Sequence, residues 1–282
     1  MTNLIFDLVG TNGDINYKIN YFPDGQRSIT IEEDDVQKLY KSVHVIIVAS
    51  MRKFSDLELI SSAASALKLH TKNYSLYSPY IIGARSDRKF SVGGDFYFND
   101  VILPILERCG FQEITTLDNH CKRSILTDVP FWQLTDFYTK KDFGMIFPDK
   151  SAYERFSKFD RASDYVYMNK TRVDDKVIQV EDSKECMDRI LELDEIVIFD
   201  DLFDGGASYI NLCKMIVNDY EYSGKITIFV THFIGSNYNI LKELENLGIK
   251  IVTSNSYYSL NKTDNIKFID VFSKKMIEAI FN

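Results

Sequence analysis

Two kinds of hydrophobic pattern alternate along the chain. Continuous apolar runs rich in β-branched residues are typical of strands buried on both faces of a sheet, whereas apolar residues spaced by three or four are typical of amphipathic helices. The first pattern predicts strands at 44–49, 74–80, 113–118, 144–147, 165–168, 196–200, 225–231 and 249–253. The second predicts helices at 56–69, 99–109, 208–217, 238–247 and 276–281, while 21–25 reads as a turn between two short strands.

The order of these segments predicts the class of fold. Strands that alternate with helices form parallel sheets with helical crossovers. The pattern runs through twice, with a weak seam near 136–142. We therefore expect an α/β protein with two similar domains, at 1–138 and 139–282, each a mainly parallel sheet flanked by helices.

Composition narrows the possible partners and compartments. With 282 residues, 45% of them hydrophobic and 26% charged, the chain can build a sizeable core. Its net charge of −8 argues against a general binder of nucleic acid or anionic membrane, which would use Lys and Arg. No apolar run has the length of a membrane span and the N-terminus does not resemble a signal peptide, so a cytoplasmic protein is expected. The many Asn, Ile, Lys and Tyr residues are typical of an AT-rich genome; for a viral protein, the compartment would be the host cytoplasm.

The four cysteines do not indicate chemistry. Cys109, Cys121, Cys186 and Cys213 are scattered and lack the Cys-x-x-Cys spacing of zinc or redox sites. We expect them to be core residues or unreactive thiols.

The segment 196–208 carries the strongest chemical signal. A buried strand ends in Asp200 and Asp201, a third acid follows at Asp204, and small residues then open a helix. Small residues let backbone N–H groups approach an anion at a helix N-terminus, and the two acids would face sugar hydroxyls, directly or through Mg²⁺. The plain alternative is an ordinary loop with acidic residues. The residues expected to bind a phosphate and the sugar hydroxyls are Asp200, Asp201, Asp204, Gly205, Gly206, Ala207 and Ser208.

A cationic loop follows an earlier strand. Arg85, Arg88 and Lys89 lie close together after the run at 74–80, on a chain that is acidic overall. Arginine suits bidentate contacts with phosphate, and open α/β sheets bind ligands beyond the carboxyl ends of their strands. A solvated charged turn is the alternative reading.

Segment 196–208 resembles the phosphoribosyl-diphosphate (PRPP) loop of phosphoribosyltransferases and PRPP synthetases. The length of the chain and its additional α/β unit favour the synthetases. Pro79, Tyr80 and 84–88 resemble the PYxxxARQDR segment with which those enzymes hold ATP, with Ser86 in place of Gln. The resemblance implies ATP-binding roles for Arg85, Ser86, Asp87 and Arg88.

Two further motifs imply a magnesium site. Segment 116–120 resembles the DLH motif of the family, whose His lies beside the metal and the ATP phosphates, and this points to His120. Segment 147–152 resembles SPDxGG, whose acid lies near ribose and metal, and this points to Asp149; Ser151 and Ala152 replace the glycines. A structural histidine and a helix N-cap are the alternatives.

The remaining motifs are a flap, a turn and a histidine. Lys170 and Arg172 match the K-x-R pair of a flexible catalytic flap, although their spacing alone fits an ordinary hairpin equally well. Segment 22–26 resembles FxDGE, which implies an ATP-site role for Asp24, with Gln26 in place of Glu. His232 matches the His of a CTH motif, where a packing role is as plausible as a direct one.

The resemblance implies an enzyme that uses Mg²⁺ and ATP. It would transfer the β,γ-diphosphate of ATP to the anomeric hydroxyl of ribose 5-phosphate, giving PRPP and AMP. Lys170, Arg172 and His120 are the expected catalytic residues. A homo-oligomer is expected, without nucleic-acid or membrane partners, and the absence of a predicted helix in 4–21 would alter the oligomer and its regulatory anion site.

Three alternatives remain. The loop 204–208 lacks one hydroxyl of the common family sequence and offers more space, so a larger acceptor such as ADP-ribose is conceivable, with a role in nucleotide or NAD metabolism. A non-catalytic regulatory member ranks third. A phosphoribosyltransferase is disfavoured, because no segment reads as its base-binding hood and the arginine loop would have no role.

Overall fold

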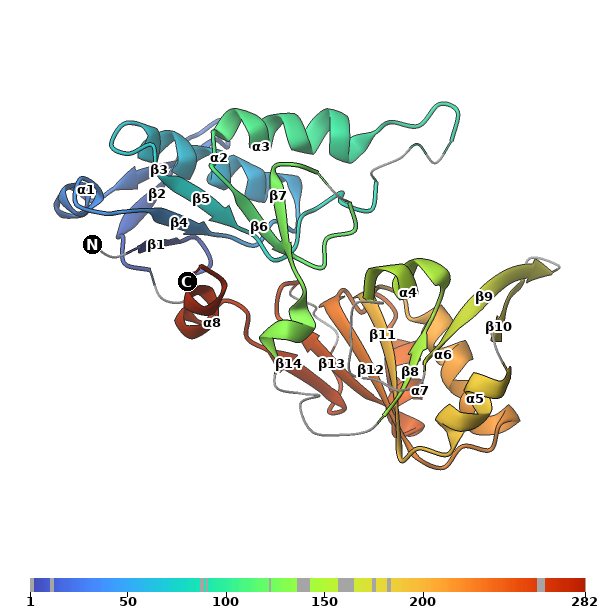
Figure 1. The fold of residues 1–282 in the computed structure, drawn as a ribbon. Helices are drawn as coiled ribbons and strands as arrows, with labels where there is room; N and C mark the ends of the chain where they lie inside the picture. The colour runs from blue at the N-terminus through green and yellow to red at the C-terminus, as the bar shows by residue number, and fades with distance from the viewer. Residues whose placement is uncertain are drawn as a thin grey trace. The chain divides into compact units, whose positions relative to one another are not determined.

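The chain folds into two compact units, each built around a mainly parallel sheet (Figure 1). The computed structural model describes residues 3–10, 13–86, 89, 91–121, 123–135, 143–156, 165–173, 176–181, 184–257 and 262–281, with the backbone alone at 169–173 and 176–181. The units are Met1–Leu134 with Asp270–Asn282, and Thr135–Ile269. The predicted fold class, two α/β domains with helices flanking mainly parallel sheets, is confirmed.

The first unit contains a five-stranded parallel sheet in the order β1-β4-β5-β6-β7. Its strands are β1 (Leu4–Asp7), β4 (Val45–Val48), β5 (Tyr74–Tyr77), β6 (Ile114–Leu117) and β7 (Leu126–Val129). A separate antiparallel hairpin consists of β2 (Tyr17–Tyr21) and β3 (Arg27–Ile31). The helical segments are α1 (Glu33–Leu39), α2 (Phe54–Lys68), the π-turn η1 (Tyr97–Ile102), α3 (Leu103–Cys109), the 3-10 turn η2 (Phe131–Leu134) and α8 (Lys274–Phe281).

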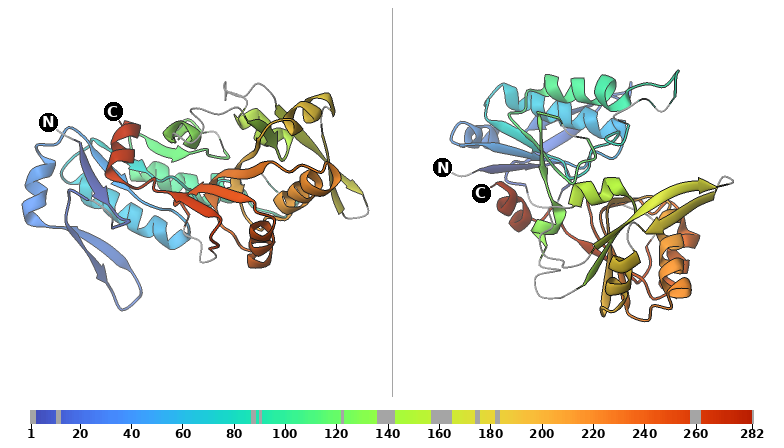
Figure 2. Two further views of the ribbon diagram at one scale, coloured as in Figure 1. Left: turned by 90° about the horizontal axis from the view of Figure 1, so that it is seen from below. Right: turned by 45° about the vertical axis from the view of Figure 1, so that its right-hand side comes forward.

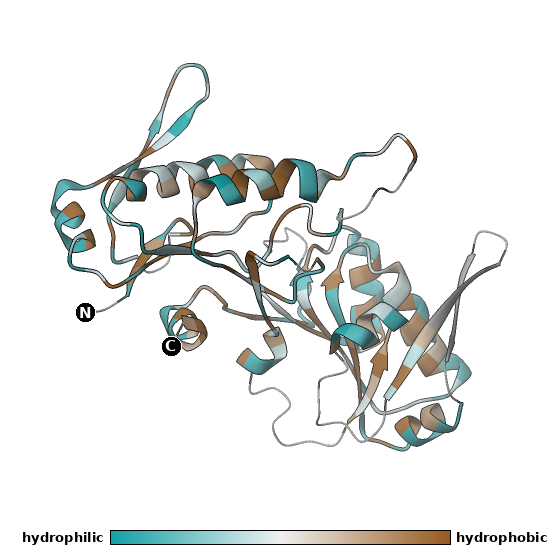
Figure 3. Ribbon diagram, turned by 45° about the horizontal axis from the view of Figure 1, so that its top comes forward, coloured by the Kyte–Doolittle hydropathy of each residue, from teal (hydrophilic) through white to brown (hydrophobic). Residues whose placement is uncertain are grey.

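Helices α2 and α3 lie along one face of this sheet, and both carry hydrophobic and hydrophilic residues, as amphipathic helices do (Figures 1 and 3). Leu57, Ile60 and Leu67 of α2 are buried in the core formed with the strands. The continuous apolar runs of the sequence are thus buried between the sheet and its helices.

The C-terminal segment belongs to the first unit, whereas the sequence-based division placed all of 139–282 in the second. Tyr77 of β5 is fully buried, and its hydroxyl donates to the carbonyl of Val271 at 3.1 Å. Its ring packs edge-on against Phe272 and Phe281, with centroids 6.4 and 6.0 Å away. A buried tyrosine needs both apolar contact and a hydrogen-bond acceptor, and the last segment supplies both. The expected boundary at 138/139 lies outside the described residues.

The second unit contains a seven-stranded sheet in the order β10-β9-β8-β11-β12-β13-β14, parallel except for the edge strand β10. Its strands are β8 (Gly144–Phe147), β9 (Tyr165–Val173), β10 (Lys176–Glu181), β11 (Glu195–Phe203), β12 (Lys225–Phe233), β13 (Lys250–Ser254) and β14 (Ile266–Ile269). Its helical segments are α4 (Lys150–Phe156), α5 (Lys184–Leu191), α6 (Ala207–Lys214), the π-turn η3 (Met215–Asp219) and α7 (Tyr238–Asn246). Figure 2 shows the β9–β10 hairpin extending away from the rest of this sheet.

Helices cover this sheet on both faces. Helices α5, α6 and α7 bury Ile190, Leu212 and Leu241 against one face. The shorter α4 lies on the other face, where the ring of Phe156 is 6.2 Å from that of Phe199 (Figure 1). Both faces of β11 are therefore packed, as its uninterrupted apolar run predicts.

The strongly periodic elements occur where the pattern predicts them, and the differences lie at their ends. Strand β8 has the predicted bounds, and the turn at 21–25 joins β2 to β3. Strand β11 runs to Phe203, beyond the expected end at Asp200, because Leu202 and Phe203 pair with His232 and Phe233 of β12. The helix expected at 208–217 ends at Lys214 and continues as the π-turn η3. The hydrophobic pattern did not predict α1, α4, α5 and β14, which have four to eight residues each and show little periodicity.

Candidate functional site

The carboxyl ends of β8 and β11 bring the predicted acids of the second unit to one edge of the sheet. These strands pair in parallel, with Ile146 opposite Ile198. Asp149 follows the end of β8, and Asp200 and Asp201 lie in the last part of β11. In α/β sheets this edge is where ligands bind.

Asp201 forms an ion pair with Arg155 of α4. Only 17% of the arginine side chain and 13% of the aspartate side chain are exposed. The pair is thus largely shielded from solvent, and it fixes α4 against β11 beside the loop. Sequence reasoning missed Arg155, because only the fold brings α4 and β11 together.

Asp200 is bonded to the protein through both carboxyl oxygens. Its Oδ1 accepts from the N–H of Asp201 at 2.8 Å, and its Oδ2 lies 2.9 Å from the hydroxyl oxygen of Tyr209. Burial and the adjacent charge of Asp201 raise the pKa of Asp200 well above its usual range. Burial, together with the charges of Asp200, Asp201 and Asp149, likewise raises the pKa of Tyr209. The three carboxyls therefore share one electrostatic environment.

The loop after β11 turns sharply into α6 at Gly206. The backbone φ of Gly206 is +82°, and a Cβ there would lie 2.5 Å from the Phe203 ring and 2.9 Å from Ile240. Only glycine fits this turn. Asp204 is tied to the next loop, since its Oδ1 accepts from the Ser236 hydroxyl at 2.9 Å and its carbonyl accepts from the Ser236 N–H at 3.1 Å. Helix α6 then begins at Ala207 and Ser208, and the first N–H groups of a helix have no acceptor within it.

Asp149 acts as a cap for α4. Its Oδ1 accepts from the N–H of Ala152 at 2.9 Å, which is the capping contact that the alternative reading expected. Among the described residues, no three His, Cys, Asp or Glu side chains gather closely enough to hold a metal ion. Mg²⁺ is commonly held by one or two carboxylates together with substrate phosphates, so the carboxylate of Asp149 fits such an ion. The imidazole of His120 fits less well, because Mg²⁺ prefers oxygen ligands.

The arginine loop of the first unit follows β5 and is fixed by Gly83. The φ of Gly83 is +77°, and a Cβ there would lie 2.6 Å from the Tyr97 ring. The N–H of Ser86 donates to the carbonyl of Gly83 at 2.7 Å, and the carbonyl of Ser86 accepts from Phe98 at 3.2 Å. Arg85 is exposed. The other two predicted ATP-binding residues of this loop, Asp87 and Arg88, lie outside the described residues.

His120 lies in the loop after β6, the strand that pairs in parallel with β5. The preceding Asp118 has a φ of +39°, which is uncommon for a residue with a side chain. Its Oδ2 accepts from the N–H of Phe131 at 3.1 Å, and Asp128 Oδ1 accepts from the N–H of Asn119 at 2.7 Å. The loop is therefore held in shape, and His120 and Arg85 follow the carboxyl ends of neighbouring strands.

The remaining residues singled out from the sequence are Lys170, Arg172, Asp24 and His232. Lys170 and Arg172 lie in β9, opposite Gln179 and Val177 of β10; their side chains are outside the described part of the chain. Asp24, in the turn between β2 and β3, accepts the N–H of Gln26 at 3.0 Å. His232 is 5% exposed and its Nδ1 lies 2.8 Å from the Ser256 hydroxyl, which fits a packing role.

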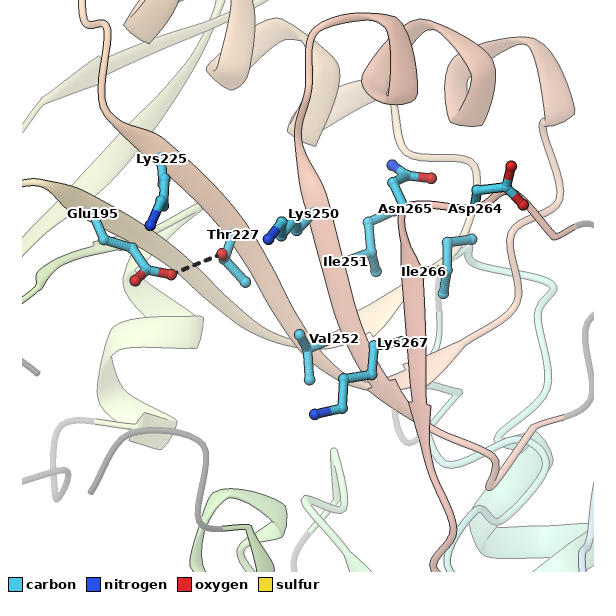
Figure 4. Close-up of a pocket in the computed structure, with 10 residues that line it drawn as sticks. All are labelled: Glu195, Lys225, Thr227, Lys250, Ile251, Val252, Asp264, Asn265, Ile266 and Lys267. Carbon is cyan, nitrogen blue, oxygen red and sulfur yellow. Dashed lines mark hydrogen bonds between the residues drawn. The ribbon is translucent and has the colours of Figure 1, made fainter. Parts of the chain in front are cut away.

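A cavity of about 420 Å³ lies at the opposite end of the second sheet and contains none of the predicted site residues. Its walls come from the first residues of β11 to β14, including Glu195, Lys225 and Lys250 (Figure 4). The Thr227 hydroxyl donates to Glu195 Oε1 there at 3.0 Å. We therefore place the candidate site at the carboxyl edge, where the acids and glycine loop lie.

Most of the cysteines lie in the interior of the protein. All four are free thiols, and Cys109, Cys121 and Cys213 are buried. Burial raises the pKa of Cys213 to about 12, so its thiol stays protonated and unreactive. None of the helices in the described part of the chain combines the length and the hydrophobicity that a membrane span requires.

Comparisons with known proteins support the fold assignment. No model of a known protein family matches the chain, and no curated protein matches it in sequence. Among solved structures, phosphoribosylpyrophosphate synthetase from Mycobacterium smegmatis is similar, with a TM-score of 0.71 and 14% sequence identity. The match covers 100% of this chain and 99% of that one. The whole chain thus shares the fold of that enzyme.

Proposed function

We propose that the protein is a Mg²⁺-dependent diphosphokinase that transfers the β,γ-diphosphate of ATP to the anomeric hydroxyl of ribose 5-phosphate. The products would be PRPP and AMP. The observation that carries this proposal is the arrangement at the end of β11, where Asp200 and Asp201 precede the tight turn at Gly206 into α6. The full-length likeness to a PRPP synthetase fold supports it.

The residues of the second unit would bind the acceptor. The carboxyl groups of Asp200 and Asp201 can accept hydrogen bonds from the ribose hydroxyls. The backbone of residues 204–208 can bind the 5-phosphate, because N–H groups at a helix N-terminus favour anions. Such contacts hold the anomeric hydroxyl in place for attack, and positioning supplies much of the catalysis in phosphoryl transfer.

The cationic residues would bind ATP and stabilise the transferred group. Arg85, with Ser86, Asp87, Arg88 and Asp24, is proposed to bind ATP. Lys170, Arg172 and His120 are proposed to stabilise the charge that develops on the diphosphate. Asp149 would hold Mg²⁺, whose chemistry is to neutralise phosphate charge and orient the reacting oxygens.

One observation favours a larger acceptor as the second candidate. A Cβ built at Gly205 meets only the Ser236 hydroxyl, at 3.6 Å, so the loop has room at this point. ADP-ribose has the same anomeric ribose and a 5-phosphate that continues into a nucleotide. The same chemistry on that acceptor would give ADP-ribose 1-diphosphate.

The test is AMP release from Mg-ATP, measured by chromatography with ribose 5-phosphate, with ADP-ribose and with no acceptor. AMP formed only with ribose 5-phosphate supports the first candidate, and a preference for ADP-ribose supports the second. No acceptor-dependent AMP would refute both and leave a non-catalytic regulatory protein. Asp200→Asn should abolish AMP release, whereas Asp188→Asn, at an exposed acid of α5, should not change it.

A further inference from the structure

The Tyr209 hydroxyl lies within hydrogen-bond distance of two oxygens that both require a donor. Asp200 Oδ2 is 2.9 Å away and the carbonyl oxygen of Leu202 is 2.8 Å away. A tyrosine hydroxyl carries one proton, and a carbonyl oxygen only accepts. If the tyrosine donates to an ionised Asp200, then its oxygen and the Leu202 carbonyl face each other at 2.8 Å without a proton between them.

A second proton removes this conflict. If Asp200 is a carboxylic acid, it donates to the Tyr209 oxygen, and Tyr209 donates to Leu202. Both short contacts are then hydrogen bonds. The raised pKa of Asp200, caused by burial and by the charge of Asp201, agrees with this assignment.

The ring of Tyr209 is held rigidly, so the position of its hydroxyl is well defined. It stacks on Phe203 with the centroids 4.8 Å apart and the planes 10° from parallel. Phe203 is fully buried and also packs against Gly206, where no side chain fits. The same turn that opens α6 therefore places Tyr209 over Asp200.

We propose that Tyr209 is a positioning residue that fixes the proton and the orientation of Asp200, so that the two adjacent acids meet a sugar diol as one carboxylic acid and one carboxylate. This inference rests on the proposed function. Asp200, Asp201 and Arg155 then carry no net charge together. An acceptor with an anionic 5-phosphate can approach this neutral group without the repulsion that two ionised acids would add.

The other charged groups around Asp200 are consistent with this state. Asp201 precedes Leu202 on the same strand and is paired with Arg155 of α4. Asp149, at the start of α4, adds negative charge near Tyr209. His232 of the neighbouring β12 is bonded to Ser256 through Nδ1. Arg155 supplies the positive charge in this group, and it forms an ion pair with Asp201.

The first arm of the test uses Tyr209→Phe, which keeps the stack on Phe203 and removes only the hydroxyl. We expect the KM for the acceptor to rise about tenfold, as for one lost hydrogen bond to a carboxyl group, while the KM for ATP stays within twofold. The matched control is Tyr222→Phe, because Tyr222 is also buried in this unit and its hydroxyl donates to the Leu193 carbonyl at 2.9 Å. An unchanged acceptor KM in Tyr209→Phe, with only kcat reduced, overturns the positioning role.

The second arm needs no activity. The infrared spectrum of the ligand-free protein should contain the carbonyl band of a protonated carboxyl group. Asp200→Asn should remove this band, Tyr209→Phe should shift it, and Asp188→Asn should leave it unchanged. A spectrum without an Asp200-dependent band overturns the inference. If the wild type releases no AMP with any acceptor, the proposed function fails, and this arm still decides where the proton lies.

Discussion

Arg155 and Asp201 form an ion pair that is largely withdrawn from water, with 17% and 13% of their side chains exposed. We predict that Arg155→Met destabilises the protein by about 3 kcal/mol, because it leaves a largely buried carboxylate without its partner, next to Asp200. Urea unfolding followed by circular dichroism measures this difference in the free energy of unfolding.

The matched control for that prediction lies in the same helix. Lys150 and Glu154 pair at 4.0 Å, with 67% and 66% of their side chains exposed. Exposed pairs contribute little, so Lys150→Met should cost less than about 0.5 kcal/mol. Similar losses in both variants would show that the surroundings of Asp201 do not distinguish it from a surface acid.

Asp200 should destabilise the ligand-free fold at neutral pH. Its pKa in the folded protein is raised by burial and by Asp201, so the folded state binds a proton that the unfolded chain loses near pH 4. The contribution of this group to the free energy of unfolding is fully present below about pH 4. It is lost as the pH rises through the pKa that Asp200 has in the folded protein. We predict that Asp200→Asn raises the free energy of unfolding at pH 7 and has a smaller effect near pH 4.

Thermal unfolding of the two proteins across this pH range measures the effect. Asp188→Asn, at an exposed position of α5, serves as the control and should follow the wild type throughout. If the stabilities of the wild type and of Asp200→Asn differ by the same amount at every pH, then the raised pKa of Asp200 does not affect stability, and the prediction is wrong. Together with the loss of AMP release, the expected result would mean that Asp200 is kept for function at some expense of stability.

The sequence predicts the sheet interior well, because continuous apolar runs can be satisfied only by burial. The runs that became β4, β8 and β12 are examples. The order of the motifs also places Arg85, His120, Asp149 and Asp200 after or near strand ends, which the structure shows. These features depend on residues close together in the chain.

The relationships between distant residues could not be predicted. Arg155 reaches Asp201 only because α4 packs over β11, and nothing in the pattern of α4 distinguishes this arginine from a surface residue. Tyr209 reads as an ordinary apolar residue in the first turn of a helix, although its hydroxyl bonds to Asp200. Strand β11 extends past two acids because of its pairing with β12, whereas acids normally indicate the end of a strand.

Two adjacent glycines should respond differently to the same substitution. Gly206→Ala places a Cβ against Phe203 and Ile240 at a φ of +82°, and we predict a loss of about 2–4 kcal/mol in stability. Gly205→Ala meets only the Ser236 hydroxyl at 3.6 Å and should change stability by less than about 1 kcal/mol. Urea unfolding compares the two, and equal losses would contradict the role assigned to the turn at Gly206.

Arg85 should contribute to ATP binding and little to stability. It is exposed, in a loop whose shape is fixed by Gly83 and by the backbone bonds of Ser86, so its removal should leave the fold intact. Charge-assisted hydrogen bonds to phosphate contribute about 1.5–3 kcal/mol, so Arg85→Ala should raise the KM for ATP at least about tenfold and leave the KM for the acceptor nearly unchanged. The control is Arg108→Ala, at an exposed arginine in the last turn of α3, which removes the same charge elsewhere in this unit. Steady-state AMP release at varied ATP concentration measures the KM of both variants. If Arg108→Ala raises the KM for ATP as much as Arg85→Ala does, the effect comes from the net charge of the protein, and the loop after β5 is not the ATP site.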